Sequence, residues 1–272
     1  MQISFTKIPS NKFNTILIPV FEDKKPTLPT DLFIDKEVVN QINSVISKKV
    51  FSGKKNTLKT FYQQVKKNFQ TIILCGCGKT KTFTYDTCRE IGGTLSRALR
   101  TAKSSHANID LSVLLINENS KSLLLQAFSE GAILGYYQFN QLKKSKEPVH
   151  DVKTIEIQLT DISQKEATSA IQKGIITAKS TNIARDLANM PANLLTPKDF
   201  VNYAKKQFKP YKNTKLTILD KVAAKKLKMN AFLGVAQGSA NDPYMLIIEY
   251  SSQAKEKPIC VVGKGVTFDS GG

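Results

Sequence analysis

The residues that could do chemistry lie in the last part of the chain. An apolar run leads into Gly263-Lys264-Gly265, and Asp269 follows five residues after the lysine. Flanking glycines allow turns and close backbone approaches that a side chain would prevent. A lysine amine beside a divalent cation loses its proton because the cation disfavours the ammonium form, and a carboxylate can bind the same cation. Lys264 and Asp269 are therefore candidate metal ligands, although a structural ion pair at a strand end explains the spacing equally well.

Several familiar catalytic patterns are absent from the sequence. It contains two histidines, His106 and His150, and no paired-histidine zinc motif, which excludes a histidine-rich metal site. No serine stands in the G-x-S-x-G pattern of α/β-hydrolases. Residues 78–80 (GKT) resemble the end of a phosphate-binding loop, but Ile73 stands where that loop needs its first glycine. The two glycines at 76 and 78 are better explained by a tight turn between a strand and a helix.

Positioning the candidate ligands requires strands and helices, and these alternate along the chain. Apolar and β-branched runs predict strands, and apolar residues at helical spacing predict helices. The predicted strands are 14–21, 69–75, 111–116 and 155–159, and the predicted helices are 37–46, 88–102, 121–138 and 164–187. Thr196 and Pro197 then predict a helix start, and strands are predicted at 216–219, 245–248 and 259–262. The alternation predicts an α/β fold.

The length of 272 residues suggests two domains. Residues 140–152 are polar and helix-breaking, so we expect an N-terminal α/β domain over 1–152. A connecting strand and helix over 153–190 is expected to follow. The start of a second α/β domain, which is incomplete, is expected over 191–272.

Composition excludes other classes of protein. Hydrophobic residues make up 41% of the chain and charged residues 23%, which is typical of a globular protein rather than a disordered one. Four cysteines are too few for a disulfide framework, and Cys75, Cys77 and Cys88 are better explained as core residues than as ligands of a soft metal. We see no signal peptide and no apolar run long enough to cross a membrane, so we expect a cytoplasmic protein.

The chain is strongly basic, with 40 Lys and Arg against 22 Asp and Glu and a net charge of +18. Two lysine groups carry much of the excess, one between residues 48 and 81 and the other between residues 205 and 228. Such groups could bind nucleic acid by releasing counterions. Lysine predominates over arginine, which favours a solvated surface over a phosphate-binding one.

The last eleven residues, 262–272 (VGKGVTFDSGG), resemble the metal-binding signature of the leucyl aminopeptidases, also called cytosol aminopeptidases. Other segments agree in the order in which that family has them. Residues 129–144 resemble the helix that closes the family's N-terminal domain, and residues 185–197 resemble the entry to its catalytic domain. Residues 234–239 and 244–250 are similar to its next strands. The resemblance spans nearly the whole chain and is strongest from Arg185 onward.

This resemblance implies an N-terminal α/β domain and the beginning of an α/β metallopeptidase catalytic domain with a mixed sheet. It implies a homohexamer in the full-length protein and removal of N-terminal residues, preferentially leucine, from peptide substrates. Two divalent ions, Mn²⁺ or Zn²⁺, would activate a water. By position, Lys264 would bind one ion and Asp269 would bind both.

The rest of the family's site does not occur in these residues. Three further carboxylate ligands, a catalytic lysine and a catalytic arginine are expected beyond Gly272, so no catalytic residue is assigned within the chain. We therefore expect a C-terminally truncated member that is inactive by itself. The alternatives are a basic, catalytically incomplete protein that binds nucleic acid, and a structural subunit of a larger assembly.

Overall fold

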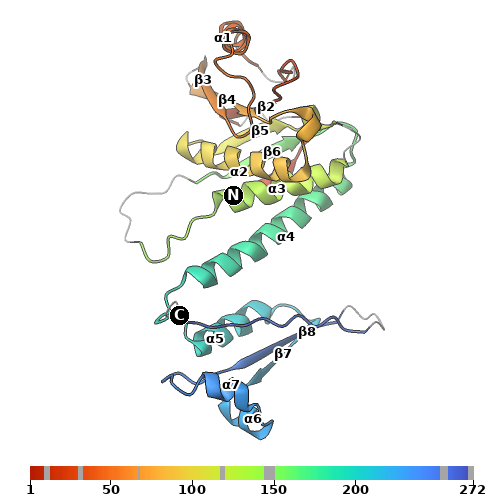
Figure 1. Ribbon diagram of the computed structural model, residues 1–272. Coiled ribbons are helices and arrows are strands. Elements are labelled where there is room, and N and C mark those ends of the chain that lie inside the picture. The colour runs from red at the N-terminus through yellow and green to blue at the C-terminus, as the bar shows by residue number, and fades with distance from the viewer. Residues whose placement is uncertain are drawn as a thin grey trace. The chain divides into compact units, whose positions relative to one another are not determined.

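The computed structural model describes residues 1–8, 13–29, 33–66, 68–116, 120–143, 151–251 and 257–268. The chain divides into two compact units, Met1–Arg185 and Asp186–Gly272 (Figure 1). Within the described ranges, no helix is long and apolar enough to span a membrane. The fold is mixed α/β, as the alternation of elements predicted.

A six-stranded sheet organises the first unit. The strands are β1 (Gln2–Phe5), β2 (Thr15–Val20), β3 (Leu58–Val65), β4 (Asn68–Gly76), β5 (His106–Asp110) and β6 (Thr154–Gln158). Their order in the sheet is β1-β6-β5-β2-β4-β3. β3 runs antiparallel to β4, and all other neighbouring pairs are parallel, so the sheet is mixed.

Helices cover both faces of this sheet. The helices are α1 (Lys36–Ser47), α2 (Tyr85–Thr101), α3 (Lys121–Tyr136) and α4 (Gln164–Asn189). Val38 and Ile42 of α1 belong to one buried cluster with Ile16 of β2, whereas residues of α2, α3 and α4 form a second cluster with Leu17 of β2. Successive residues of a strand point to opposite faces. The apolar run of β2 is therefore buried on both sides.

Glycines allow α2 and α3 to approach each other very closely. A Cβ atom at Gly131 of α3 would lie 1.8 Å from the carbonyl oxygen of Arg89 in α2, and one at Gly135 would lie 2.4 Å from the Cα of Gly93. Contacts this short are impossible for real atoms, so neither position accepts a side chain without a backbone shift. The helix pair depends on having no side chain at these two points.

The second unit is smaller and less buried. It contains α5 (Pro197–Phe208), β7 (Thr214–Leu219), α6 (Lys221–Lys226), α7 (Asn230–Val235) and β8 (Met245–Tyr250). β7 and β8 pair antiparallel. The predicted helix start is confirmed, because the Thr196 hydroxyl accepts from the Asp199 amide and the Asp199 carboxylate accepts from the Thr196 amide. Among the described residues of this unit, the buried hydrophobic side chains are Val201, Ala204 and Ala224.

The strand predicted at 111–116 is wrong. The strand at this point is β5, His106–Asp110, and a short 3-10 helix, η2, covers Ser112–Leu114. The Asp110 carboxylate accepts a hydrogen bond from the Ser112 amide at 2.8 Å, which turns the chain out of the sheet. Leu111 and Leu114 are nevertheless fully buried. The apolar run fills the core without pairing to another strand.

The strand expected to connect the two domains belongs to the first sheet. β6 lies between β1 and β5; it pairs with β5 over its whole length and with β1 from Thr154 to Ile157. The helix after it, α4, contains the boundary between the two compact units, at Arg185.

Three cysteines are core residues, as predicted. Cys75, Cys77 and Cys88 are fully buried, and the Cys88 thiol donates to the Leu124 carbonyl at 3.6 Å. Burial raises the pKa of the Cys77 thiol to about 12 and raises the pKa values of the Cys75 and Cys88 thiols as well. The thiolate is the reactive form of cysteine. Burial and the raised pKa values therefore both make these thiols unreactive toward reagents in solution.

We therefore expect one fast-reacting thiol per native chain, that of the exposed Cys260. Ellman's reagent should titrate the other three cysteines only after denaturation. The variant Cys260→Ser should abolish the fast phase. A fast phase that persists in this variant would show that the core of the first unit opens readily.

Hydrogen bonds lower the pKa values of carboxyl groups in the first unit. The Asp23 carboxylate accepts from the amide and hydroxyl of Thr80, and these bonds hold the Asp23 pKa below its ordinary value of 3.8. Hydrogen bonds from Lys55 and Asn56 likewise lower the pKa of Glu90 below 4.5. A lowered folded-state pKa stabilises the protein above the unfolded-state pKa, and this contribution is lost as the pH falls through the folded value.

The urea midpoint of the first unit should therefore decrease as the pH falls from about 5 to about 3. Asp23→Asn should lower the midpoint at neutral pH and make its decrease with acid shallower, because the ionised partner of Thr80 is gone. The neighbouring exposed Glu22→Gln is the matched control and should follow the unmodified chain. A parallel decrease in both variants would contradict the role given to Asp23.

Candidate metal-binding segment

Lys264 lies in residues 257–268, which form no helix or strand in the second unit. Its side chain is exposed. A Cβ atom at Gly263 or Gly265 would have no heavy atom within 4 Å. The glycines that flank the lysine are thus surrounded by open space, and no close approach among the described residues requires them.

The strand predicted at 259–262 is wrong. Ile259, Val261 and Val262 are 93%, 89% and 86% exposed, so this apolar run is not buried. A strand needs a neighbour to satisfy its backbone groups, and neither β7 nor β8 pairs with this segment. The apolar composition of residues 259–262 is typical of a buried strand, but among the described residues no strand pairs with this segment.

Asp269 lies outside the described residues, so the placement of its carboxylate near the Lys264 amine remains a prediction. Among the residues that the structure does describe, no three His, Cys, Asp or Glu side chains come close enough together to hold a metal ion. One exposed amine is not a metal site. The described residues therefore do not by themselves fit a pair of divalent ions.

Two of the segments singled out in the sequence contact each other within the first unit. The Arg185 guanidinium donates to the Leu134 carbonyl at 3.1 Å and lies 5.5 Å from the centre of the Tyr137 ring. Arg100 of α2 donates to the Tyr136 carbonyl at 3.3 Å. Both arginines thus bind the C-terminal end of α3, where free carbonyls favour positive charge. Arg185 has a structural role here.

The turn after β4 is also structural. Gly78 has a φ of +76°, and its amide donates to the Gly53 carbonyl at 2.9 Å. The Asp23 carboxylate already accepts a hydrogen bond from the Thr80 amide, to which a phosphate would be expected to bind. The tight strand-to-helix turn predicted here is confirmed.

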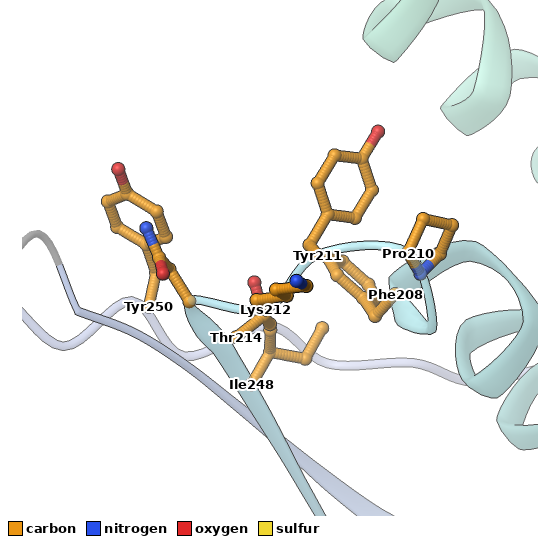
Figure 2. Close-up of a pocket in the computed structure, with 8 residues that line it drawn as sticks. Phe208, Pro210, Tyr211, Lys212, Thr214, Ile248 and Tyr250 are labelled. Carbon is orange, nitrogen blue, oxygen red and sulfur yellow. The ribbon is translucent and has the colours of Figure 1, made fainter.

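A hollow that sequence reasoning did not single out lies in the second unit. Figure 2 shows Phe208, Pro210 and Tyr211 on one side of it and Ile248 and Tyr250 of β8 on the other. Its volume is about 620 Å³, and of its described lining residues Lys212 alone is charged. Such a lining can bury apolar groups but offers no acid–base pair. The only feature of the sequence that pointed to this hollow was the pair of aromatic residues in the segment 208–211.

Comparison with known families adds evidence of a different kind. The N-terminal domain of the cytosol aminopeptidase family matches residues 17–146, and the catalytic domain of that family matches residues 182–272. The first match lies inside the first compact unit, and the second nearly coincides with the second unit.

Individual relatives give the same result. The chain is 31% identical over 228 residues to the probable cytosol aminopeptidase of Bdellovibrio bacteriovorus, which covers 84% of this chain and 45% of the relative. It is 30% identical over 277 residues to the probable cytosol aminopeptidase of a Sulfurihydrogenibium species, which covers 100% of this chain and 54% of the relative. The chain thus spans about half the length of these curated relatives.

Solved structures with a similar fold include a mutant of tomato leucine aminopeptidase. The two structures match with a TM-score of 0.84 at 23% sequence identity. The match covers 99% of this chain and 55% of the tomato enzyme's chain. The bottromycin maturation enzyme BotP in complex with Mn matches with a TM-score of 0.66 at 17% identity, covering 88% of this chain and 45% of that chain. These likenesses show a shared fold.

Proposed function

Because the chain belongs to the cytosol aminopeptidase family, we propose that it forms the N-terminal domain and the first part of the catalytic domain of a metal-dependent aminopeptidase. The enzyme would release N-terminal residues, preferentially leucine, from peptides. The observation that carries this proposal is the position of residues 262–272 (VGKGVTFDSGG) inside the segment that matches the family's catalytic domain. That segment holds the candidate ligands Lys264 and Asp269.

In this proposal, Lys264 would bind one divalent ion through its amine, and Asp269 would bind both ions through its carboxylate. Mn²⁺ or Zn²⁺ would be the ions. BotP, which shares this fold, has been solved in complex with Mn, and this complex supports divalent metal dependence. The exposure of Lys264 leaves its amine accessible to such an ion.

We propose further that these 272 residues are inactive by themselves. Two ligands do not complete a two-metal site, and the described residues contain no group of three or more His, Cys, Asp or Glu side chains that could hold a metal ion. With leucine p-nitroanilide and added Mn²⁺, this chain should show no turnover above the background of the metal alone. Robust turnover would contradict the proposed incompleteness.

A protein in which this chain continues into a complete catalytic domain of the family is the positive control. It should hydrolyse the same substrate and lose activity on chelation. If it is inactive with both Mn²⁺ and Zn²⁺, the aminopeptidase assignment itself fails. The two outcomes separate the proposed activity from the proposed incompleteness.

Location and assembly follow the same proposal. Relatives named as cytosol aminopeptidases support a cytoplasmic protein, and we propose a homohexamer for the full-length enzyme. Nucleic-acid binding remains the alternative. The described lysines of the two basic groups, at residues 48–81 and 205–228, are mostly exposed. The two groups lie in separate units. Affinity for DNA that falls steeply between low and moderate salt would favour this alternative.

A further inference from the structure

Two aromatic side chains are exposed next to each other on the sheet of the first unit, where β3 and β4 form its edge (Figure 1). Tyr62 of β3 is 64% exposed and Phe69 of β4 is 73% exposed. Tyr62 lies opposite Thr71, two residues along β4 from Phe69, so the two are diagonal neighbours about 7 to 8 Å apart. Ile73, two residues further along β4, packs in the buried cluster with α2. Both aromatic residues therefore lie on the same face of the sheet as α2.

A lysine lies at the Phe69 end of this pair. Lys66 directly follows β3, and its side chain is exposed. Gln64 lies opposite Phe69, and its side-chain amide donates to the Lys66 carbonyl at 3.3 Å. The backbone of Lys66 is thus held beside Phe69.

A second lysine lies on the α2 side of the pair. Lys103 is exposed and directly precedes Ser104, whose hydroxyl accepts a hydrogen bond from the Thr15 hydroxyl at 2.6 Å. Thr15 pairs with Thr71, which in turn lies opposite Tyr62. These three residues form a row across three strands, so Thr15 is about 10 Å from Tyr62. Lys103 therefore lies over the same face of the sheet as Tyr62.

An arginine lies near the beginning of β3. The exposed Arg97 of α2 donates to the Thr94 hydroxyl at 3.2 Å, and that hydroxyl donates to the Asn56 side chain at 3.2 Å. Asn56 stands two residues before β3. Lys66, Lys103 and Arg97 thus approach the aromatic pair from three sides. None of the three forms an ion pair with a carboxylate in the part of the chain that the structure describes.

Negative charge is scarce around this surface. No acidic residue occurs in the sequence between Glu37 and Asp86, a stretch that includes all of β3 and β4. The carboxylate of Glu90 lies near the beginning of β3, but it already accepts hydrogen bonds from Lys55 and Asn56. The surface around the two rings is therefore positive, and it favours a partner that carries negative charge.

We propose that Tyr62 and Phe69 form a stacking platform for single-stranded nucleic acid, with Lys66, Lys103 and Arg97 contacting its phosphates. Aromatic side chains on neighbouring strands of a sheet stack successive bases in sheets that bind RNA. Positive side chains beside such rings bind the backbone by releasing counterions. This inference does not rest on the proposed enzyme activity, and both can hold for one chain.

The aromatic pair distinguishes this surface from the other lysine-rich parts of the chain. Lysines alone favour a solvated surface, and lysine lacks the planar fork with which arginine binds phosphates and bases. Binding by stacking does not need that fork, because every base offers a flat face to an aromatic ring. A single strand is therefore the polyanion that uses both the rings and the charges, whereas a duplex keeps its base faces stacked on one another.

Fluorescence anisotropy with a labelled oligothymidylate of about 12 nucleotides tests the platform on the 272-residue chain at low salt. Tyr62→Ala and Phe69→Ala should each weaken binding by about 5- to 100-fold through the loss of one stacked base. Phe69→Tyr should retain the affinity because it keeps the ring. Ile176→Ala is the matched control and should also retain it, since it removes a 62% exposed apolar side chain from α4. Circular dichroism confirms that each variant is folded.

The salt dependence of the same binding tests the charges. Lys66→Gln and Lys103→Gln should each reduce the slope of log K against log salt by about 0.7. Lys165→Gln, which removes an exposed lysine at the start of α4, should leave the slope unchanged.

Four results would overturn the proposal. The first is no binding of the oligothymidylate at low salt, and the second is an affinity that neither aromatic substitution changes. The third is equal affinity for a DNA duplex of the same length, which would mean that charge alone is responsible. The fourth is binding to phosphatidylserine vesicles without binding to the oligothymidylate, which would identify a membrane as the partner.

Discussion

Gly131→Ala should unfold the first unit at markedly lower denaturant, with a loss of about 3 kcal/mol or more in the free energy of unfolding. The new methyl carbon would lie 1.8 Å from the Arg89 carbonyl oxygen. The backbone of α3 fixes the position of this carbon and the oxygen belongs to the backbone of α2, so neither atom can rotate away. An alanine gains about 1 kcal/mol in helix propensity, which is too little to offset the clash. Urea denaturation followed by circular dichroism measures the effect.

Gly93→Ala in α2 is the control for this experiment. Its new Cβ would lie 3.3 Å from the Gly131 carbonyl oxygen, a distance that small adjustments can relieve. We expect a change within about 1 kcal/mol. Equal urea midpoints for the two variants would mean that α2 and α3 are farther apart than the structure places them.

Lys264→Met and Asp269→Asn should each abolish most aminopeptidase activity in a protein that continues this chain into a complete catalytic domain. Loss of residues that merely support metal ligands lowers activity or metal affinity by about 10- to 100-fold, so loss of a ligand should exceed this. The two variants should also differ. Lys264→Met should lose one bound ion per chain, whereas Asp269→Asn should weaken binding of both ions.

Lys257→Met provides a matched control, because Lys257 is an exposed lysine in the same segment. It should retain activity and metal content. Activity is measured as kcat/KM for leucine p-nitroanilide, and bound metal is measured by elemental analysis after dialysis. If Lys264→Met behaves like Lys257→Met, the lysine is not a ligand and the structural ion pair becomes the better explanation of the motif.

The sequence predicts most elements of the first unit, and the errors have identifiable causes. Long apolar runs such as β2 are buried on both faces and give a clear signal. β3 was not predicted because its inward side chains include Gln63, which is buried but satisfied by hydrogen bonds to Asp35, Phe33 and Gln70. A buried glutamine of this kind makes a strand appear polar in sequence.

The error at 111–116 has the opposite cause. Leu111 and Leu114 are as buried as any strand residue, but the true strand, β5, carries the buried polar Asn108. Composition reports burial, whereas strand pairing depends on which segments lie side by side. That arrangement depends on contacts between distant parts of the chain.

The candidate site was predicted from a motif alone. Residue spacing identified Lys264 and Asp269, but it could not show that the surrounding segment would be exposed and unpaired among the described residues. A ligand set that is distributed over distant segments cannot be recovered from any one of them. Family resemblance supplies that information, and local periodicity does not.

The position of β1 has a consequence for synthesis on the ribosome. Residues 2–5 leave the exit tunnel well before residues 154–158, which form β6, their only strand neighbour among the described residues. Apolar residues such as Ile3 and Phe5 must therefore wait, uncovered, while about 150 further residues are translated. We expect these apolar residues to be available to a chaperone during that interval, because β1 can join the sheet only after β6 has been made.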